Sequence, residues 1–207
     1  MAPQLLTQMK NRQSQRHHRS IRTSAAKYLR EAGDRFVLSG KGLVDKDSDP
    51  AEDEANVRSA LIITKRALLL DPSNYEAIVL IGNLYGDSDD ARSTSLALEY
   101  YDRAIQIDPE APDAYASKAG LLLYDLNRPQ EAEPLANRAL ALSIRNEDTV
   151  TQLELTYLLL IDIFLAQKRF WKARATIREA LRKCPGTLMD AIARNLRKEI
   201  EAEKSGR

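Results

Sequence analysis

Residues Tyr75–Pro109, YEAIVLIGNLYGDSDDARSTSLALEYYDRAIQIDP, decide the fold of this chain. Two segments within them repeat large and small residues at spacings of three and four. The first segment carries Ile78, Ile81, Gly82 and Tyr85, and the second carries Ala97, Tyr101 and Ala104 before Asp108-Pro109 ends it. This spacing places the residues on one face of each segment, which predicts two helices packed closely against each other.

The same pattern recurs on both sides of this stretch. Ala60, Ala97, Ala132 and Ala173 are separated by 37, 35 and 41 residues, so the unit has a nearly constant length. A helix pair of this size is too small to bury its own apolar face and must stack on its neighbours. Because runs that alternate with a period of two are missing, the sequence predicts an all-α repeat protein.

These residues resemble the tetratricopeptide repeat family, whose first helix has a large residue, an apolar-then-small pair and an aromatic residue. The family's second helix has Ala, an aromatic residue, Ala and then Pro, and the stretch above matches both helices. The fourth unit matches with an aliphatic residue in place of the aromatic one, at Ala173, Ile177, Ala180 and Pro185. Three positions depart from the family pattern: Lys118, Ile144 and Ile161.

The resemblance implies a right-handed helical-repeat solenoid of about four helix pairs with a C-terminal capping helix. We expect a basic tail at residues 1–23, repeats at 24–185, and the capping helix with its end at 186–207. Ser73, with Glu76 three residues later, predicts the start of one helix. Pro134 lies in an expected helix, where it costs little only in the first turn or two.

Composition excludes several classes of protein. The net charge of +1 gives the whole chain no strong bias toward nucleic acid or membrane, and no apolar run is long enough to span a bilayer. The single cysteine, Cys184, excludes an internal disulfide and favours a reducing compartment, so we expect a cytoplasmic protein.

The sequence also lacks the residues of an enzyme. His17 and His18 are the only histidines, so Cys184 has no base placed beside it, and adjacent histidines in a tail more often do nothing than bind a metal. Gly-rich phosphate loops, zinc-ligand spacings and Ser-His-Asp patterns are missing. We therefore expect no enzyme activity, no cofactor and no metal.

The resemblance implies that the first helix of each pair lines a concave groove that holds a partner peptide or helix. The predicted groove residues are Glu76, Val79, Leu80, Asn83, Asp113, Ser117, Tyr124, Leu155, Leu159 and Asp162, with Ala116, Gly120 and Leu158 beside them. Of the positions that bind acidic chaperone tails in some family members, only Asn83 fits, so such a clamp is not expected. The groove favours an amphipathic helix or an extended apolar peptide. In the alternative, Leu155, Leu158 and Leu159 are covered by the last helix.

The function predicted from these features is that of a protein-interaction adaptor. One alternative is a structural subunit of a larger complex. Another is a nucleic-acid-associated factor that uses the cations of the tail, Lys10, Arg12, Arg16, Arg19 and Arg22. The tail has three interpretations: a solvated end, an arm for nucleic acid or an acidic membrane, and an organelle-targeting presequence.

Overall fold

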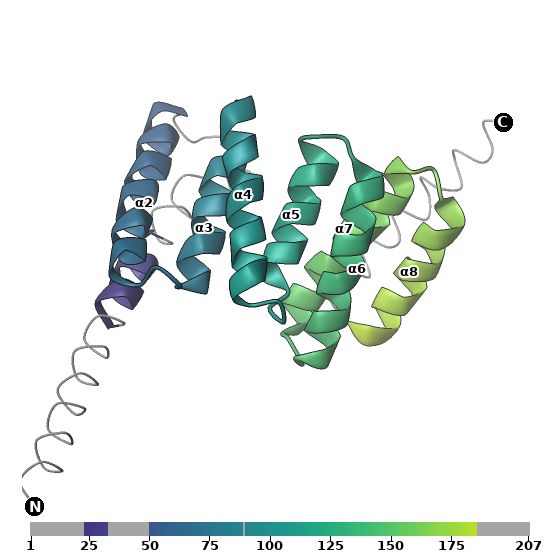
Figure 1. Cartoon of the computed structure of the whole chain (residues 1–207). Helices are drawn as coiled ribbons and strands as arrows, with labels where there is room; N and C mark the ends of the chain where they lie inside the picture. Colours follow the sequence, from purple (N-terminus) through teal and green to yellow (C-terminus); the bar gives the residue numbers. More distant parts are fainter. Residues whose placement is uncertain (1–22, 33–49, 89, 186–207) are drawn as a thin grey trace, which may run out of the picture. The chain divides into compact units, whose positions relative to one another are not determined.

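The computed structural model describes residues 23–32, 50–88 and 90–185, and within these ranges all regular structure is helical (Figure 1). The predicted basic tail, apart from Thr23, and the predicted capping helix lie outside the described residues. Their predictions therefore stay predictions, as does the division at residues 23 and 185.

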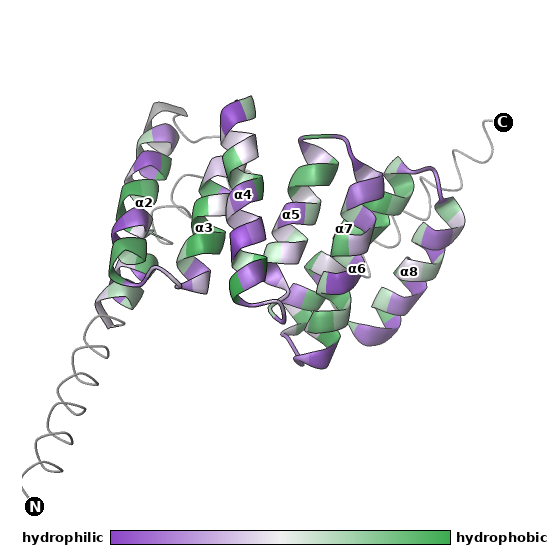
Figure 2. Ribbon diagram, in the orientation of Figure 1, coloured by the Kyte–Doolittle hydropathy of each residue, from purple (hydrophilic) through white to green (hydrophobic). Residues whose placement is uncertain are grey.

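The helices follow one another in pairs, as the repeat predicts. Residues 23–32 are helical, and the later elements are α2 (Pro50–Leu70), α3 (Tyr75–Gly86), α4 (Ala91–Ile107), α5 (Asp113–Tyr124), α6 (Pro129–Arg145), α7 (Val150–Ala166) and α8 (Phe170–Lys183). Hydrophobic and hydrophilic residues alternate along them, which is the pattern expected of helices with one buried face (Figure 2). The prediction of an all-α fold built of helix pairs is confirmed.

The chain divides into two compact units, Met1–Ile107 and Asp108–Arg207. In the first unit, Ala32, Ala60 and Leu84 form a buried cluster where the first helix, α2 and α3 meet. Four partly buried residues pack against this cluster: Val57, Leu61, Ile63 and Leu80. The second pair is joined by Tyr101 on α4, which is 3% exposed and donates a 2.9 Å hydrogen bond to Oδ1 of Asn83 on α3.

In the second unit, α6 packs against both α5 and α7, and α8 packs against α7. The small residues of α6 and the corresponding residues of α8 are fully buried: Ala132, Ala136, Ala139, Ala173, Ile177 and Ala180. The short side chains of the alanines let neighbouring helices approach closely. A second cluster joins Tyr157 on α7 to Ala180 and Cys184.

The structure tests two local predictions, the start of α3 and the effect of Pro134 on α6. The cap of α3 is Asn74 rather than Ser73, because the side-chain Oδ1 of Asn74 accepts a 3.0 Å hydrogen bond from the backbone N–H of Ala77. The Ser73 hydroxyl instead donates to Asp71, so the predicted start was wrong by one residue. Helix α6 continues through Pro134, which lies exposed in its second turn.

Candidate functional site

The first helices of the third and fourth pairs, α5 and α7, lie side by side. Two hydrogen bonds join them. Near the start of both helices, Nε2 of Gln152 donates to Oδ1 of Asp113 at 3.1 Å. Near their ends, the hydroxyl of Tyr124 donates to Oδ2 of Asp162 at 2.6 Å. Since both bonds join corresponding ends, the two helices run parallel.

We call the surface between these two bonds the α5–α7 face. It consists of Asp113, Ser117, Gly120 and Tyr124 on α5, and Gln152, Leu155 and Asp162 on α7. At 1.5 Å per residue, the two hydrogen bonds lie about 16 Å apart along the helices. The face is therefore long enough for about three turns of a partner helix or for a short extended peptide.

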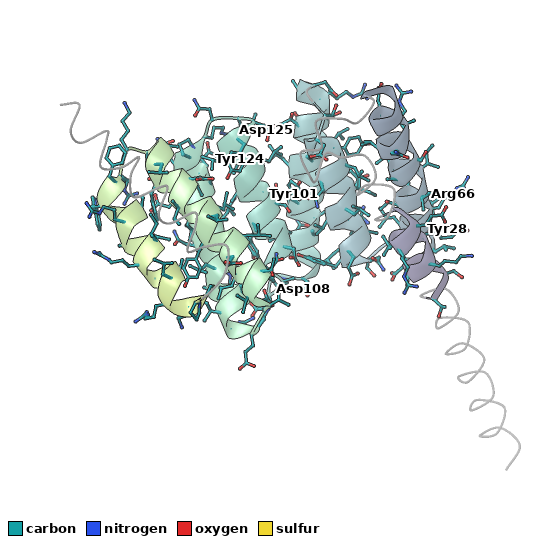
Figure 3. All side chains as sticks on the ribbon, turned by 180° about the vertical axis from the view of Figure 1, so that it is seen from behind. Tyr28, Arg66, Tyr101, Asp108, Tyr124 and Asp125 are labelled. Atoms are coloured by element: carbon teal, nitrogen blue, oxygen red, sulfur yellow. The ribbon has the colours of Figure 1, made fainter. Side chains whose placement is uncertain are left out.

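The bond between Tyr124 and Asp162 is the most unusual part of the face. Tyr124 is the last residue of α5, beside Asp125, and is 62% exposed (Figure 3). Asp162 is half-buried, and this burial raises the pKa of its carboxyl group although the bond from Tyr124 lowers it. Its own burial and the charge and hydrogen bond of Asp162 raise the pKa of Tyr124, so its hydroxyl stays protonated as a donor.

This carboxylate has room for another donor. Within the part of the chain that the structure describes, Tyr124 is the one hydrogen-bond donor to Asp162. A carboxylate has about four acceptor positions, and a cation or N–H group nearby would favour its charged form. The face carries a second acid, Asp113, and none of its seven residues is Lys or Arg.

Beside the carboxylate lies an apolar side chain with free surface. Leu155 stands two helical turns before Asp162 on the same side of α7 and is 56% exposed. Gly120 has no side chain, so a partner backbone could approach α5 closely there. Chemically, the face combines an anionic acceptor with an apolar surface.

The other predicted groove residues of the second unit lie deeper. Leu159 is 8% exposed, and Leu158 packs against the cluster of Tyr157, Ala180 and Cys184. Ser117 is half-buried on the face. The sequence pattern does not single out Gln152, because a polar residue in the first turn of a helix is common. Its position three residues before Leu155 is the signal that could have found it.

In the first unit, most of the predicted groove residues serve the fold. Val79 is 8% exposed, and Leu80 packs against Ala32, Ala60 and Leu84. Asn83 holds the Tyr101 hydroxyl, so its amide already has a structural partner. Glu76 alone is exposed, in the first turn of α3. Little of this set is available to a ligand in the described structure.

The remaining candidate residues do not form a chemical site in the described structure. Cys184 is fully buried, and burial, together with the charge of Glu154, raises the pKa of its thiol. Among residues 23–32, 50–88 and 90–185, no three His, Cys, Asp or Glu side chains are grouped to hold a metal ion. None of the helices in these ranges is long and apolar enough to cross a membrane. His17, His18 and the cations of the tail lie outside the described residues.

Comparison with known proteins finds similar solved structures, among them two bacterial proteins. Comparisons with protein families and with curated proteins find no match. Among solved structures, the chain is similar to TTC0263, a thermophilic tetratricopeptide repeat protein of Thermus thermophilus, with 19% identity and a TM-score of 0.56. That alignment covers 86% of this chain and 97% of the other. It is also similar to PilF of Pseudomonas aeruginosa, with 20% identity, a TM-score of 0.56 and coverage of 83% and 71%.

At this level of identity the two structures establish the fold. Together with the buried alanines of the second helices and the paired order of the elements, they confirm the resemblance that the repeat period predicts. The chain has a tetratricopeptide-repeat-like, all-α helical-repeat fold.

Proposed function

We propose that this protein is an interaction scaffold that binds a segment of a partner protein on the α5–α7 face. The carrying observation is the half-buried carboxylate of Asp162, which receives a hydrogen bond from Tyr124 beside the exposed side chain of Leu155. The ligand that fits is a peptide or helix with one Lys or Arg and a neighbouring apolar residue. The cation would complete the hydrogen bonding of Asp162, and the apolar residue would cover Leu155.

A role in binding accounts for an arrangement that does not favour folding. Burying a carboxylate with a single donor lowers stability, and residues of this kind occur more often at functional sites than elsewhere. The cation of a bound segment would offset the cost of that burial. The proposal is for binding without catalysis, in line with the lack of catalytic motifs in the sequence, and the cytoplasmic location stays a prediction.

The test is a selection from a random peptide library displayed on phage, with the full-length protein as the target. We expect the selected peptides to be enriched in Lys or Arg next to an apolar residue. Their affinity for Asp162→Asn and for Gly120→Leu should fall by about tenfold or more, because the first removes the negative charge and the second fills the face.

A matched control separates this face from general surface effects. Leu155→Arg should abolish binding, whereas Leu69→Arg changes an exposed leucine of α2 in the same way and should leave binding intact. Circular dichroism would confirm that each variant is folded. Selected peptides without cations, or peptides that bind Leu155→Arg and Gly120→Leu as well as the unaltered protein, would refute the proposal.

A further inference from the structure

The last described helix carries a strong excess of positive charge. Residues 168–183 contain seven cations and one acid, Glu179. That acid is already engaged, because its Oε1 accepts a 3.3 Å hydrogen bond from the hydroxyl of Tyr157. This concentration of charge contrasts with the net charge of +1 of the whole chain.

Part of this charge has a structural role. Glu133 on α6 accepts hydrogen bonds of 2.6 Å from Arg169 and 2.9 Å from Lys172 at the start of α8. The arginines farther along the helix have no such partner: within the described residues, no ion pair involves Arg174, Arg178 or Arg182. Arg178 and Arg182 are exposed and Arg174 is half-buried, so the two exposed guanidinium groups are accessible on the surface of the described structure.

These three arginines lie in one row with an exposed indole. Trp171 is the only tryptophan of the chain and is 68% exposed. The arginines follow it at three, seven and eleven residues, so one lies on each successive turn, and neighbouring arginines are about 6 Å apart along the helix. The opposite side of α8 is the buried one, with Ala173, Ile177 and Ala180. We call the row of Trp171, Arg174, Arg178 and Arg182 the α8 outer face.

We propose that the α8 outer face binds single-stranded nucleic acid, with the arginines on successive phosphates and Trp171 stacked on a base. A guanidinium group binds phosphate through two parallel hydrogen bonds and can also stack on a base. Proteins that bind single strands combine such a row of cations with aromatic side chains on which the bases stack. Both elements are present here on one helix.

Two other polyanions fit the row less well. An anionic membrane would bind a helix that inserts its apolar side, but the apolar side of α8 is fully buried in the protein. An acidic protein segment would pair with the arginines through carboxylates, but it has no flat base to cover the indole. Nucleic acid is the class that uses both kinds of side chain in the row.

The single tryptophan makes the test direct, because its fluorescence reports on this face alone. The full-length protein would be titrated with a 12-nucleotide single strand of thymidines at low salt. We expect quenching of the fluorescence as a base stacks on Trp171. We also expect the logarithm of the binding constant to fall linearly with the logarithm of the salt concentration. Trp171→Ala should bind a dye-labelled strand about tenfold more weakly, which corresponds to the loss of one stacked base.

Charge reversal provides the matched comparison. The pair Arg178→Glu and Arg182→Glu should abolish binding, whereas Arg66→Glu with Arg92→Glu makes the same change of net charge in the first unit. The variant with Arg66→Glu and Arg92→Glu should retain at least half of the affinity for the strand if the site is on α8. Equal losses in both pairs would show that only net charge matters and would refute the proposal.

Two further ligands decide between the polyanions. Polyglutamate of equal charge should compete poorly with the strand, and vesicles containing phosphatidylserine should leave the fluorescence maximum unchanged. Stronger binding of polyglutamate than of the strand, or a blue shift with vesicles and no binding of the strand, would assign the face to another partner and overturn the proposal. An absence of binding to the strand at low salt would do the same.

Discussion

The ring of Tyr101 lies so close to Gly82 that a Cβ atom on Gly82 would fall 2.6 Å from its Cε1 atom and 2.8 Å from Cδ1. Glycine at this position lets α3 and α4 approach each other. The Tyr101 hydroxyl on α4 then reaches Asn83, which follows Gly82 on α3. The large-and-small spacing in the sequence is therefore a steric requirement of the pair.

Gly82→Ala should lower the free energy of unfolding by about 1–3 kcal/mol, because the added methyl group must displace a buried ring. Denaturation by urea would measure this change. Gly120→Ala is the matched control: its Cβ would lie 4.0 Å from the Tyr124 ring, at ordinary contact distance. The control should be neutral or stabilising by up to about 1 kcal/mol. Equal effects of the two substitutions would contradict the steric argument.

Asp162→Asn should stabilise the protein at neutral pH. Burial raises the pKa of Asp162 in the folded state above its ordinary value of 3.8. The protonated carboxyl group is thus favoured by folding, and its contribution is present below that value and lost as pH rises through the folded pKa. The asparagine should raise the melting temperature at pH 7 and have little effect near pH 3. A melting temperature that falls at pH 7 would show that the charge stabilises the fold.

Much of the core could be predicted from the sequence because its period is carried by small residues. Ala60, Ala97, Ala132 and Ala173 recur at nearly equal spacing, and all four are fully buried. A helical period identifies the buried side of each helix without knowledge of its neighbour, so these residues could be found from spacing alone.

The ends of the helices could not be predicted in the same way. Helices α6 and α7 are followed by Glu147 and Lys168, whose φ angles of 55° and 58° are usually adopted by glycine. After α7, the backbone N–H of Lys168 bonds to the carbonyl of Leu165, and that of Arg169 bonds to the carbonyl of Phe164. These bonds impose the left-handed conformation on a residue whose type does not indicate it.

The candidate site was predictable only in part. The period places Tyr124 and Asp162 on the same side of their helices, but the bond between them spans 38 residues and depends on how the pairs stack. Spacing alone also does not show which neighbour covers a helix, and for this reason the burial of Val79 and the packing of Leu80 were missed.

Glu133→Gln should loosen the junction between α6 and α8. Glu133 is largely buried and accepts hydrogen bonds from Arg169 and Lys172. Its burial alone would raise the pKa of its carboxyl group, but these bonds and charges outweigh that and lower it. The substitution should lower the free energy of unfolding by about 1 kcal/mol at pH 7, as measured by urea denaturation.

The control for this junction is Glu131→Gln, which breaks an exposed pair between the first turn of α6 and Arg128, the residue before that helix, and should cause no measurable change. Since the pKa of Glu133 is lowered from its ordinary 4.5 in the folded state, its contribution is present above pH 4.5 and is lost as pH falls through the folded pKa. Equal effects of the two substitutions at pH 7 would show that burial of the pair is irrelevant.

Asp90 should make the melting temperature of the protein fall in acid, because its carboxylate stabilises the start of α4. Its Oδ1 atom accepts hydrogen bonds from the backbone N–H groups of Arg92 and Ser93 at 3.0 Å and 2.9 Å, so it caps the start of the helix. The side-chain and backbone bonds from Ser93, with a further one from Ser88, lower its pKa from the ordinary 3.8 to about 2. Folding thus favours the charged form, and the stabilisation is complete above pH 3.8 and is lost as pH falls toward 2.

Asp90→Asn keeps a capping oxygen without the charge. Thermal melts of this variant from pH 2 to pH 7 should therefore show a smaller loss of stability in acid than those of the unaltered protein. Asp90→Ala removes the capping oxygen and should melt at a lower temperature at pH 7. An acid dependence that is unchanged in Asp90→Asn would place the titrating group elsewhere.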